Sequence, residues 1–310
     1  MLPKSCDIRQ PKQIPSQPRP PVKADLQLED DWYDIVQKAR IGLGDSIAEV
    51  ARAAGISFET LELWESGAGV PDPAQLTSLA TVLGLDPGKL LAIQQGGGRP
   101  AIEAHTTDEP LRVETLTGLM RDYPVHAYLI HHVGAPDAVL VDTGYEPTHA
   151  LEAVFHRRLM LRWIVLTHCH RDHMEGAALL KAQTGARVAV PLAEGSTYRA
   201  YHREAPDLAV RPGTTIEVSP TITLSSIETP GHTAGGTSYR VGGFCAVGDA
   251  LFAGSTGRSL SPAGYRTLLS GLRARILTLP DDTILLPGHG PLTTVGHERR
   301  HNPFFPEPSA

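Results

Sequence analysis

The densest group of potential metal ligands in this sequence is the segment 167–173, which reads Thr-His-Cys-His-Arg-Asp-His. It directly follows a short apolar run and therefore lies at the expected end of a strand. His168 and His170 are two positions apart, so in an extended chain their side chains point to the same side. Asp172 and His173 come after the chain turns and could face a second ion. Because zinc and iron take imidazole and carboxylate ligands, the segment predicts a metal site.

Three further residues of metal-ligand type occur later in the chain, each flanked by Gly or Pro residues that fix a loop. His232 lies in Thr-Pro-Gly-His-Thr, Asp249 in Val-Gly-Asp-Ala, and His289 in Pro-Gly-His-Gly. Asp249 and His289 also follow apolar runs. The segment 167–173 cannot saturate two metal ions by itself. We therefore expect these three residues to join it at the ends of neighbouring strands.

The elements that must position these residues are predicted by short β-branched or apolar runs that alternate with helical stretches from about residue 105 onward. Strands separated by helices indicate sheets covered by helices, in an α/β or αββα arrangement. The expected strands are Val125–Val133, Ala138–Val141, Trp163–Leu166, Arg187–Val190, Ile222–Ile227, Phe244–Val247 and Thr283–Leu286. The expected helices lie near 147–159, 175–184 and 264–278.

The motifs in this order resemble those of the metallo-β-lactamase fold superfamily over about residues 110–303. The segment Val139–Gly144, which reads Val-Leu-Val-Asp-Thr-Gly, is similar to a motif at the end of an early strand in that family. The resemblance implies an αββα sandwich with two divalent metal ions, either zinc or mixed iron and zinc. It also implies that Asp142 supports the ligands from behind or is structural, and that it is not itself a ligand.

The same resemblance implies a role for each of the seven potential ligands. The first ion would be held by His168, His170 and His232. The second ion would be held by Asp172, His173 and His289, and Asp249 would bridge both ions. A hydroxide between the ions would attack a carbonyl carbon, and Asp172 would be the catalytic residue that orients it. Two cations lower the pKa of bound water and stabilise the oxyanion that forms on attack.

Within the superfamily, the sequence is most similar to the short glyoxalase II-like hydrolases. The similarity is carried by Thr229–Gly236, Gly248–Gly254 and Pro287–Pro291. It implies a small-molecule substrate, a thioester of the hydroxyacylglutathione type, and an enzyme that hydrolyses it. Arg258, just past the strand that precedes Asp249, is a candidate for binding a substrate carboxylate. Such an Arg can equally pair with a structural Asp.

A second enzyme family looks similar and keeps much of the same motif. Persulfide dioxygenases use a single iron, and three of the seven residues would then matter, namely His168, His232 and Asp249. The ligand types alone do not separate this alternative from the hydrolase, because both families use the same side chains. A count of the bound metal ions does separate them.

The segment 25–93 has apolar positions at helical spacing and predicts four or five short helices with tight turns. The stretch 46–90 resembles the Cro/lambda-repressor-like helix-turn-helix family, which implies DNA binding through a second helix at about 57–65. That helix carries three glutamates and no Lys, Arg, Asn or Gln, and acidic residues far outnumber basic ones across the segment. Because base reading and phosphate contacts need the missing side chains, DNA binding is not expected.

We expect the helical domain instead to mediate self-association, which would make the protein a homo-oligomer. The alternative of a different class is a ligand-sensing transcriptional regulator. In it, the metal domain would be the sensor and the helix-turn-helix the output. This alternative requires the DNA binding that the acidic second helix disfavours.

The remaining segments separate these domains and bear on location. Residues 1–24 contain six prolines, which predicts a disordered tail, and the three consecutive glycines in 94–104 predict a flexible linker. The helical domain is then 25–93 and the hydrolase domain 105–310. A net charge of −6 argues against general affinity for nucleic acid. No apolar run approaches the ~18 residues of a membrane span, and the N-terminus lacks a signal-peptide core, so the expected location is the cytoplasm.

Overall fold

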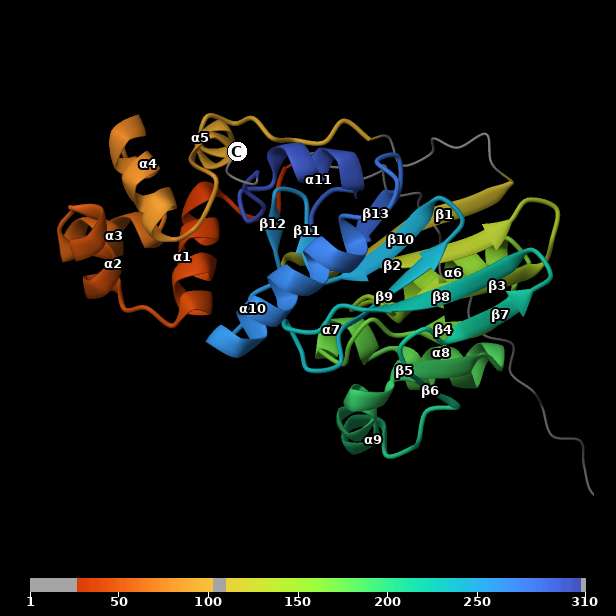
Figure 1. Ribbon diagram of the computed structural model, residues 1–310. Coiled ribbons are helices and arrows are strands. Elements are labelled where there is room, and N and C mark those ends of the chain that lie inside the picture. The colour runs from red at the N-terminus through yellow and green to blue at the C-terminus, as the bar shows by residue number, and fades with distance from the viewer. Residues whose placement is uncertain (1–26, 103–109, 308–310) are drawn as a thin grey trace, which may run out of the picture.

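The computed structural model describes residues 27–102 and 110–307, so the tail predicted for 1–24 lies outside the described residues. Helices come first along the chain, and a mixed α/β region follows them (Figure 1). The first helices are α1 (Trp32–Leu43), α2 (Ile47–Ala54), α3 (Phe58–Glu65), α4 (Pro73–Val82) and α5 (Pro87–Gln94). Within the described ranges, no helix has both the length and the apolar content that crossing a membrane requires.

Capping residues define where the helices of the first region begin and end. Ser46 accepts a hydrogen bond from the backbone N–H of Glu49, whose carboxylate accepts one from the N–H of Ser46 in return. Helix α2 ends at Gly55, whose φ of +73° favours glycine. Ser57 then caps α3 through the N–H of Thr60. The short turn places α2 against α3, as expected for a helix-turn-helix.

An ion pair fixes α3 to α1. Nε and Nη2 of Arg40 each lie 2.6 Å from a carboxylate oxygen of Glu65, and the Glu65 side chain is only 4% exposed. A bidentate pair of this kind fixes geometry as well as adding energy. Glu65 is therefore structural and unavailable to a partner. The exposed face of α3 carries Phe58, Glu59, Glu62 and Leu63.

Two six-stranded sheets form the second region. The first has the order β1 (Leu111–Met120), β2 (Tyr123–His132), β3 (Asp137–Val141), β4 (Met160–Val165), β5 (Arg187–Pro191) and β6 (Leu208–Val210). The second has the order β14 (Thr293–Thr294), β13 (Ile284–Pro287), β10 (Phe244–Gly248), β9 (Thr237–Val241), β8 (Ile222–Glu228) and β7 (Thr215–Ser219). A separate hairpin is formed by β11 (Leu251–Phe252) and β12 (Ser255–Thr256).

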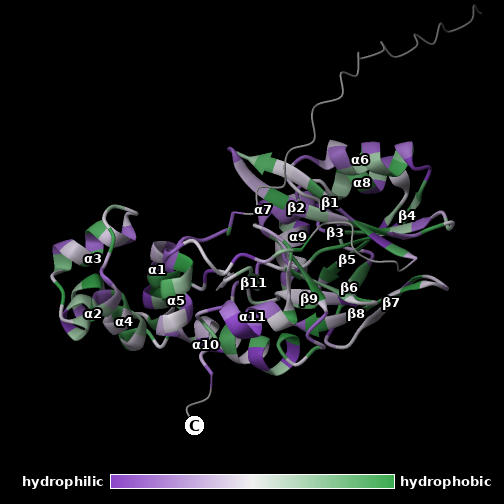
Figure 2. Cartoon of the chain, turned by 90° about the horizontal axis from the view of Figure 1, so that it is seen from above, coloured by the Kyte–Doolittle hydropathy of each residue, from purple (hydrophilic) through white to green (hydrophobic). Residues whose placement is uncertain are grey.

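Helices cover both outer faces of the paired sheets, which confirms the expected αββα sandwich. Figure 2 shows α6 and α8 on one side and α10 and α11 on the other. The helices are α6 (Pro147–His156), α7 (Arg171–Met174), α8 (Ala177–Thr184), α9 (Gly195–His202), α10 (Pro262–Gly271) and α11 (Val295–His301). A 3-10 turn, Leu192–Glu194, precedes α9, and a π-helical turn, Leu272–Ile276, extends α10. Buried residues between the sheets include Ile130, Val141, Val165, Leu224 and Leu286.

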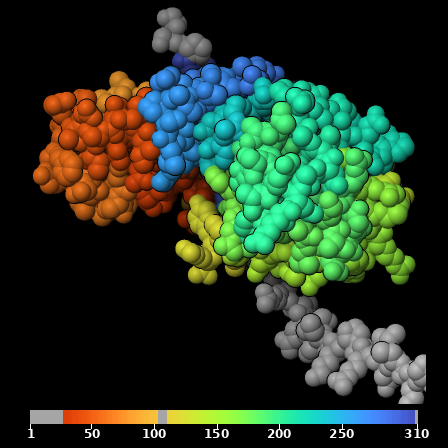
Figure 3. Space-filling view, turned by 90° about the horizontal axis from the view of Figure 1, so that it is seen from below, coloured from red at the N-terminus to blue at the C-terminus, as the bar shows by residue number. Residues whose placement is uncertain are grey.

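The helical region is docked against the sandwich. One apolar cluster joins Ile35 and Val36 of α1 with Tyr265 and Leu268 of α10. Gly42 of α1 lies so close to the Tyr265 ring that a Cβ atom there would clash. Figure 3 shows the same contact, with the helical region in orange directly against blue C-terminal segments. The two regions therefore share a hydrophobic core.

The seven expected strands all occur, with ends that shift by at most three residues. The helix expected at 264–278 corresponds to α10 and its π-helical turn. Residues 95–102 contain neither helix nor strand, and the carbonyl of Gly98 accepts a hydrogen bond from the His297 ring of α11. The domain limits at 93 and 105 stay predictions.

Candidate metal centre

The seven potential ligands meet at one edge of the sandwich, where strands of both sheets end. On the first sheet, β4 leads into His168 and His170, and α7 carries Asp172 and His173. Because β10 and β13 run parallel, their carboxyl ends meet at the same edge of the second sheet. The residues that follow strands of this sheet are His232 after β8, Asp249 after β10 and His289 after β13.

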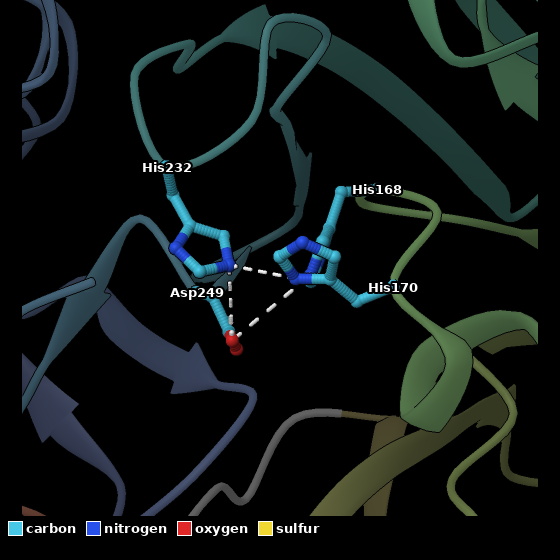
Figure 4. Close-up of side chains that lie close together, drawn as sticks. All are labelled: His168, His170, His232 and Asp249. Carbon is cyan, nitrogen blue, oxygen red and sulfur yellow. Dashed lines mark hydrogen bonds and ion pairs between the residues drawn. The ribbon is translucent and has the colours of Figure 1, made fainter. Parts of the chain in front are cut away.

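The first group of ligand atoms comes from His168, His170, His232 and Asp249, and all its atoms lie within 4.8 Å of one another (Figure 4). Nδ1 of His170 lies 3.0 Å from Nε2 of His168 and 2.9 Å from Nε2 of His232. Oδ2 of Asp249 lies 3.4 Å from Nε2 of His232. Three imidazoles and one carboxylate therefore converge on a space of the size of one metal ion.

The second group comes from Asp172, His173 and His289. Oδ2 of Asp172 lies 3.7 Å from Nε2 of His173 and 3.6 Å from Nε2 of His289. Asp249 reaches this group as well, with Oδ1 3.3 Å from Nε2 of His173 and Oδ2 3.5 Å from Nε2 of His289. Asp249 is thus the residue that contacts both groups.

Two buried polar atoms show that these side chains fit a metal centre. Nε2 of His173 and Oδ1 of Asp249 have no hydrogen-bond partner among the described residues. A buried polar atom without a partner costs about 1–3 kcal/mol, and such atoms are uncommon in folded proteins. Both atoms face the space that the ligand groups enclose, where a cation would satisfy them. The donor set of imidazoles and carboxylates suits divalent zinc or iron.

Electrostatics keep three residues of the first group, His168, His232 and Asp249, in states that can bind a cation. Burial lowers the pKa of His168 well below its usual value and also lowers that of His232, so both imidazoles are neutral. Burial favours a higher pKa for the Asp249 carboxyl, but the imidazoles of His173 and His289 outweigh it. They hold the pKa of Asp249 well below its usual range, so the carboxylate is ionised. In the second group the carboxylates of Asp249 and Asp142 outweigh burial and raise the pKa of His173 to about 10.

Comparison with known protein families shows which family the chain belongs to. Residues 120–289 match the family described as the Metallo-beta-lactamase superfamily, and residues 36–90 match the family described as Helix-turn-helix. The first match covers more than half of the chain. The chain belongs to the metallo-beta-lactamase superfamily. The expected pairing of this fold with a helix-turn-helix region is therefore confirmed.

Its curated relatives within the metallo-beta-lactamase superfamily include glyoxalase II-like enzymes, as expected. The hydroxyacylglutathione hydrolase GloC of Haemophilus influenzae is 31% identical over 193 residues, which cover 54% of this chain and 87% of the relative. A hydroxyacylglutathione hydrolase of Acidiphilium cryptum is 36% identical over 167 residues, or 53% of this chain and 63% of the relative. The expectation of a metallo-β-lactamase-fold hydrolase is confirmed at the level of the family.

Solved structures of metallo-β-lactamase-fold proteins superpose on the same region. ETHE1 from Myxococcus xanthus is 29% identical with a TM-score of 0.53, covering 61% of this chain and 83% of that one. The BLEG-1 B3 metallo-beta-lactamase is 26% identical with a TM-score of 0.55, covering 63% of this chain and all of that one. Both alignments leave more than a third of the chain unmatched.

Residues behind the ligands hold the orientation of their rings, as is general for histidines that bind metals. Asp142, with a φ of +57°, accepts hydrogen bonds from Nδ1 of His173 at 2.9 Å and from the N–H of Thr167 at 2.7 Å. The ring of His232 donates through Nδ1 to the carbonyl of Arg258 at 2.8 Å. Asp142 therefore lies behind the cluster, outside both ligand groups, where the family resemblance put it.

Two glycines allow the ligand loops to approach closely. A Cβ atom on Gly288 would collide with Asp249 and His173, and one on Gly257 would collide with the carbonyl of Asp249. Larger residues would therefore displace the carboxylate that joins the two groups. The sequence indicated Gly288 only as a loop former beside His289, and it gave no sign of this second role.

A cavity of about 320 Å³ opens onto the centre. The sandwich contributes Tyr123, His232, Asp249, Phe252, Arg258 and His289 to its lining. The helical region contributes Glu29, Asp30, Asp34 and Lys38. These four residues were missed by sequence reasoning, because nothing in the local pattern of 29–38 indicates contact with residues more than 200 positions away.

Proposed function

We propose that the chain is a metal-dependent hydrolase of thioesters of the hydroxyacylglutathione type. The observation that carries the proposal is the arrangement of seven ligand-type residues in two groups that share Asp249. The relatives named hydroxyacylglutathione hydrolase support the choice of substrate class. The 320 Å³ cavity beside the centre gives a small-molecule substrate access to it.

In this proposal each group of ligands holds one ion, zinc or iron. The proposed ligands are His168, His170 and His232 for the first ion, Asp172, His173 and His289 for the second, and Asp249 for both. Two bound cations would act as Lewis acids and lower the pKa of a water molecule between them, so that it can attack at neutral pH. The chain itself supplies the ligand geometry.

Asp172 is the proposed catalytic residue. Its carboxylate lies between the rings of His173 and His289 and is 12% exposed at the side chain. Burial favours a higher pKa for Asp172, but the imidazoles of His289 and His173 together outweigh burial and the pKa falls below its usual value. The ionised group can accept a hydrogen bond from the attacking water and orient it. In the overall reaction a C–O bond forms, the C–S bond breaks, and the thiolate takes up a proton.

The second candidate is a mono-iron persulfide dioxygenase, with which the likeness to ETHE1 is consistent. That function would need His168, His232 and Asp249 as ligands and would leave Asp172, His173 and His289 without a metal. The buried and unpartnered Nε2 of His173 favours the hydrolase, because it lies in the second group.

The experiment that tests this choice compares two variants with the wild-type chain. Each is purified without added metal, its metal content is measured, and release of thiol from S-lactoylglutathione is followed. His289→Ala should lose one of about two metal ions and most of the activity. His156→Ala, an exposed His at the end of α6, should match the wild type. One iron per wild-type chain, with oxygen uptake on glutathione persulfide and no thioester cleavage, would select the dioxygenase.

For the helical region we propose self-association, giving a homo-oligomer. Phe58, Leu63 and Val70 are 42%, 52% and 73% exposed on or just after α3, where a DNA-binding relative needs cations. The neighbouring exposed side chains include Glu59 and Glu62, which oppose contact with phosphates. Light scattering should give more than one chain per particle for the wild type and a monomer for Leu63→Glu. A wild-type monomer would remove this proposal.

A further inference from the structure

The helical region forms one side of the cavity that opens onto the metal centre. Glu29, Asp30, Asp34 and Lys38 line it, opposite His232, Asp249 and His289 of the sandwich. These four residues belong to α1 and the turn before it. We call the segment 29–38 the helical wall. A substrate that reaches the centre through this cavity therefore passes along side chains that the metallo-β-lactamase fold does not supply.

A buried ion pair fixes the helical wall to the sandwich. The ammonium group of Lys38 donates to Oδ2 of Asp30 at 2.5 Å and to the carbonyl of Thr256 at 3.0 Å, and both charged side chains are less than 10% exposed. The same ammonium lies 4.8 Å from the centre of the Phe252 ring. Lys38 and Asp30 neutralise each other, so neither offers a free charge to a substrate.

A second contact joins the helical wall to a residue of the cavity. Nη2 of Arg258 donates to Oε1 of Gln37 at 3.1 Å, and the Arg258 carbonyl accepts the hydrogen bond from the His232 ring. Arg258 has no carboxylate partner among the residues that the structure describes. The Asp pairing that the sequence left open is therefore not formed in the described ranges. Gln37 holds the guanidinium at the mouth of the cavity.

The carboxyl groups on the helical wall that lack an ion pair are those of Glu29 and Asp34. Burial raises the pKa of both, that of Glu29 to about 7, so an ammonium partner would favour their ionised form. Glu29 is half-buried, its backbone packs against Gly290 beside His289, and its carboxylate forms no ion pair or hydrogen bond within the described residues. Asp34 is also half-buried, and its carboxylate accepts only the N–H of Asp31 there. Since Lys38 is already paired, the cavity has an acidic side on the helical wall and a cationic side at Arg258.

We propose that the helical region completes the substrate cavity and that Glu29 selects the substrate by binding an ammonium group on its thiol carrier. This rests on the proposed thioester hydrolysis. Glu29 contacts the carrier and not the scissile carbonyl, so it determines specificity without taking part in bond making. Gln37 is a positioning residue, which acts by holding Arg258. A carrier with an ammonium group fits the acidic side, whereas an N-acylated carrier leaves Glu29 without a partner.

The test compares two thioesters that differ only in this ammonium group, S-lactoylglutathione and its N-acetyl derivative. The wild-type holoenzyme should prefer the free amine in kcat/KM by roughly 10-fold, the lower end of a charged hydrogen bond. Glu29→Gln should abolish the preference by raising KM for the free amine. Glu152→Gln, an exposed glutamate on α6, is the matched control and should keep the preference. An unchanged preference in Glu29→Gln would overturn the proposal.

A binding measurement separates this inference from the proposed reaction. S-methylglutathione and its N-acetyl derivative cannot be hydrolysed, and calorimetry on the full chain gives their Kd directly. Glu29→Gln should weaken binding of the first roughly 10-fold and leave the second unchanged. Glu29-dependent binding without thioester cleavage would retain the inference and reject the reaction. Thioester cleavage with equal binding of both compounds would reject the role of Glu29 and retain the reaction. If neither thioester cleavage nor Glu29-dependent binding is found, both the reaction and the role of Glu29 are rejected.

Discussion

The two sides of the cavity are built in different ways. The sandwich side is made of loops at strand ends, and each of its ligands comes from a short motif. The helical wall comes from contacts between residues far apart in sequence, such as Lys38 with Thr256, 218 positions away, and Gln37 with Arg258, 221 positions away. Chemistry that sits in local motifs can be read from a sequence, whereas a surface made by docking two regions needs the structure.

The two sides also differ in how their polar groups are satisfied. On the sandwich side, buried atoms of His173 and Asp249 face one another without partners, which is costly unless a cation joins them. On the helical wall, Lys38 and Asp30 satisfy each other and the carbonyl of Thr256. The first arrangement therefore serves a ligand, and the second holds two regions together. Substitutions on the two sides should consequently have different consequences.

The largest effect is expected for Asp249→Ala on the sandwich side. Because Asp249 contacts both groups of ligands, its removal should reduce activity by more than the roughly 10- to 100-fold that removal of a supporting partner costs. Thioester cleavage should fall below detection and metal content should drop, as measured by elemental analysis. Asp282→Ala, on an exposed turn, is the control. Full turnover by Asp249→Ala would remove the two-metal account.

Lys38→Met should act on stability more than on metal binding. It leaves the Asp30 carboxylate buried and unpaired, which costs about 3–5 kcal/mol in comparable pairs. Chemical denaturation should show this loss, while metal content stays at the wild-type level. The double variant Lys38→Met with Asp30→Leu should recover most of the stability. If the single variant loses metal instead, the two sides of the cavity are not independent.

Asp142→Asn probes the support behind the ligands. The amide presents a donor where the Asp142 carboxylate now accepts hydrogen bonds from His173 and Thr167. Metal affinity should fall by roughly 10- to 100-fold with the fold intact, as for other supporting partners. Competition with a chelator measures the affinity. Asp137→Asn, at the start of β3 where the carboxylate pairs with Arg162, should bind metal as the wild type does.

The smallest effect is a pH dependence of stability at Glu298 of α11. This carboxylate accepts hydrogen bonds from the N–H of Gly254, between β11 and β12, and from Thr293. Burial raises the pKa of Glu298 to about 7. A carboxyl group whose pKa is raised in the folded state contributes most to stability below the unfolded pKa near 4.5. That contribution to stability is lost as the pH rises through 7. The free energy of unfolding should differ less between pH 5 and pH 8 in Glu298→Gln than in the wild type. Equal differences in the two proteins would show that Glu298 is not the source of the pH dependence.

The sequence predicted the sandwich well, and it singled out the seven residues that the structure brings together, because the signals are local. The segments 163–166, 244–247 and 283–286 are apolar runs closely followed by His or Asp, with Gly or Pro in between after the last two, and the structure has strands at each. Among the strands that the sequence did not predict, β9, Thr-Ser-Tyr-Arg-Val, is central in its sheet but mixes polar and apolar residues. Its pattern resembles a loop until its neighbours are known. The missed helix α7 has only four residues, too few for a helical period.

The part that the sequence did not predict is the relation between the two regions. The helix-turn-helix pattern was visible, but it indicated a separate domain joined by a linker. The structure instead puts Ile35 and Val36 of α1 in one core with α10 and places Glu29 in the cavity. Such contacts depend on tertiary packing and carry no local period. Arg258 was noticed as a candidate, but its partner Gln37 could be found only in three dimensions.

The most direct test of the central claim is the metal content per chain, measured together with cleavage of S-lactoylglutathione by the same preparation. The two ligand groups joined by Asp249 predict about two metal ions per chain and release of thiol. One iron per chain, with oxygen uptake on glutathione persulfide and no thiol release from the thioester, would contradict the account.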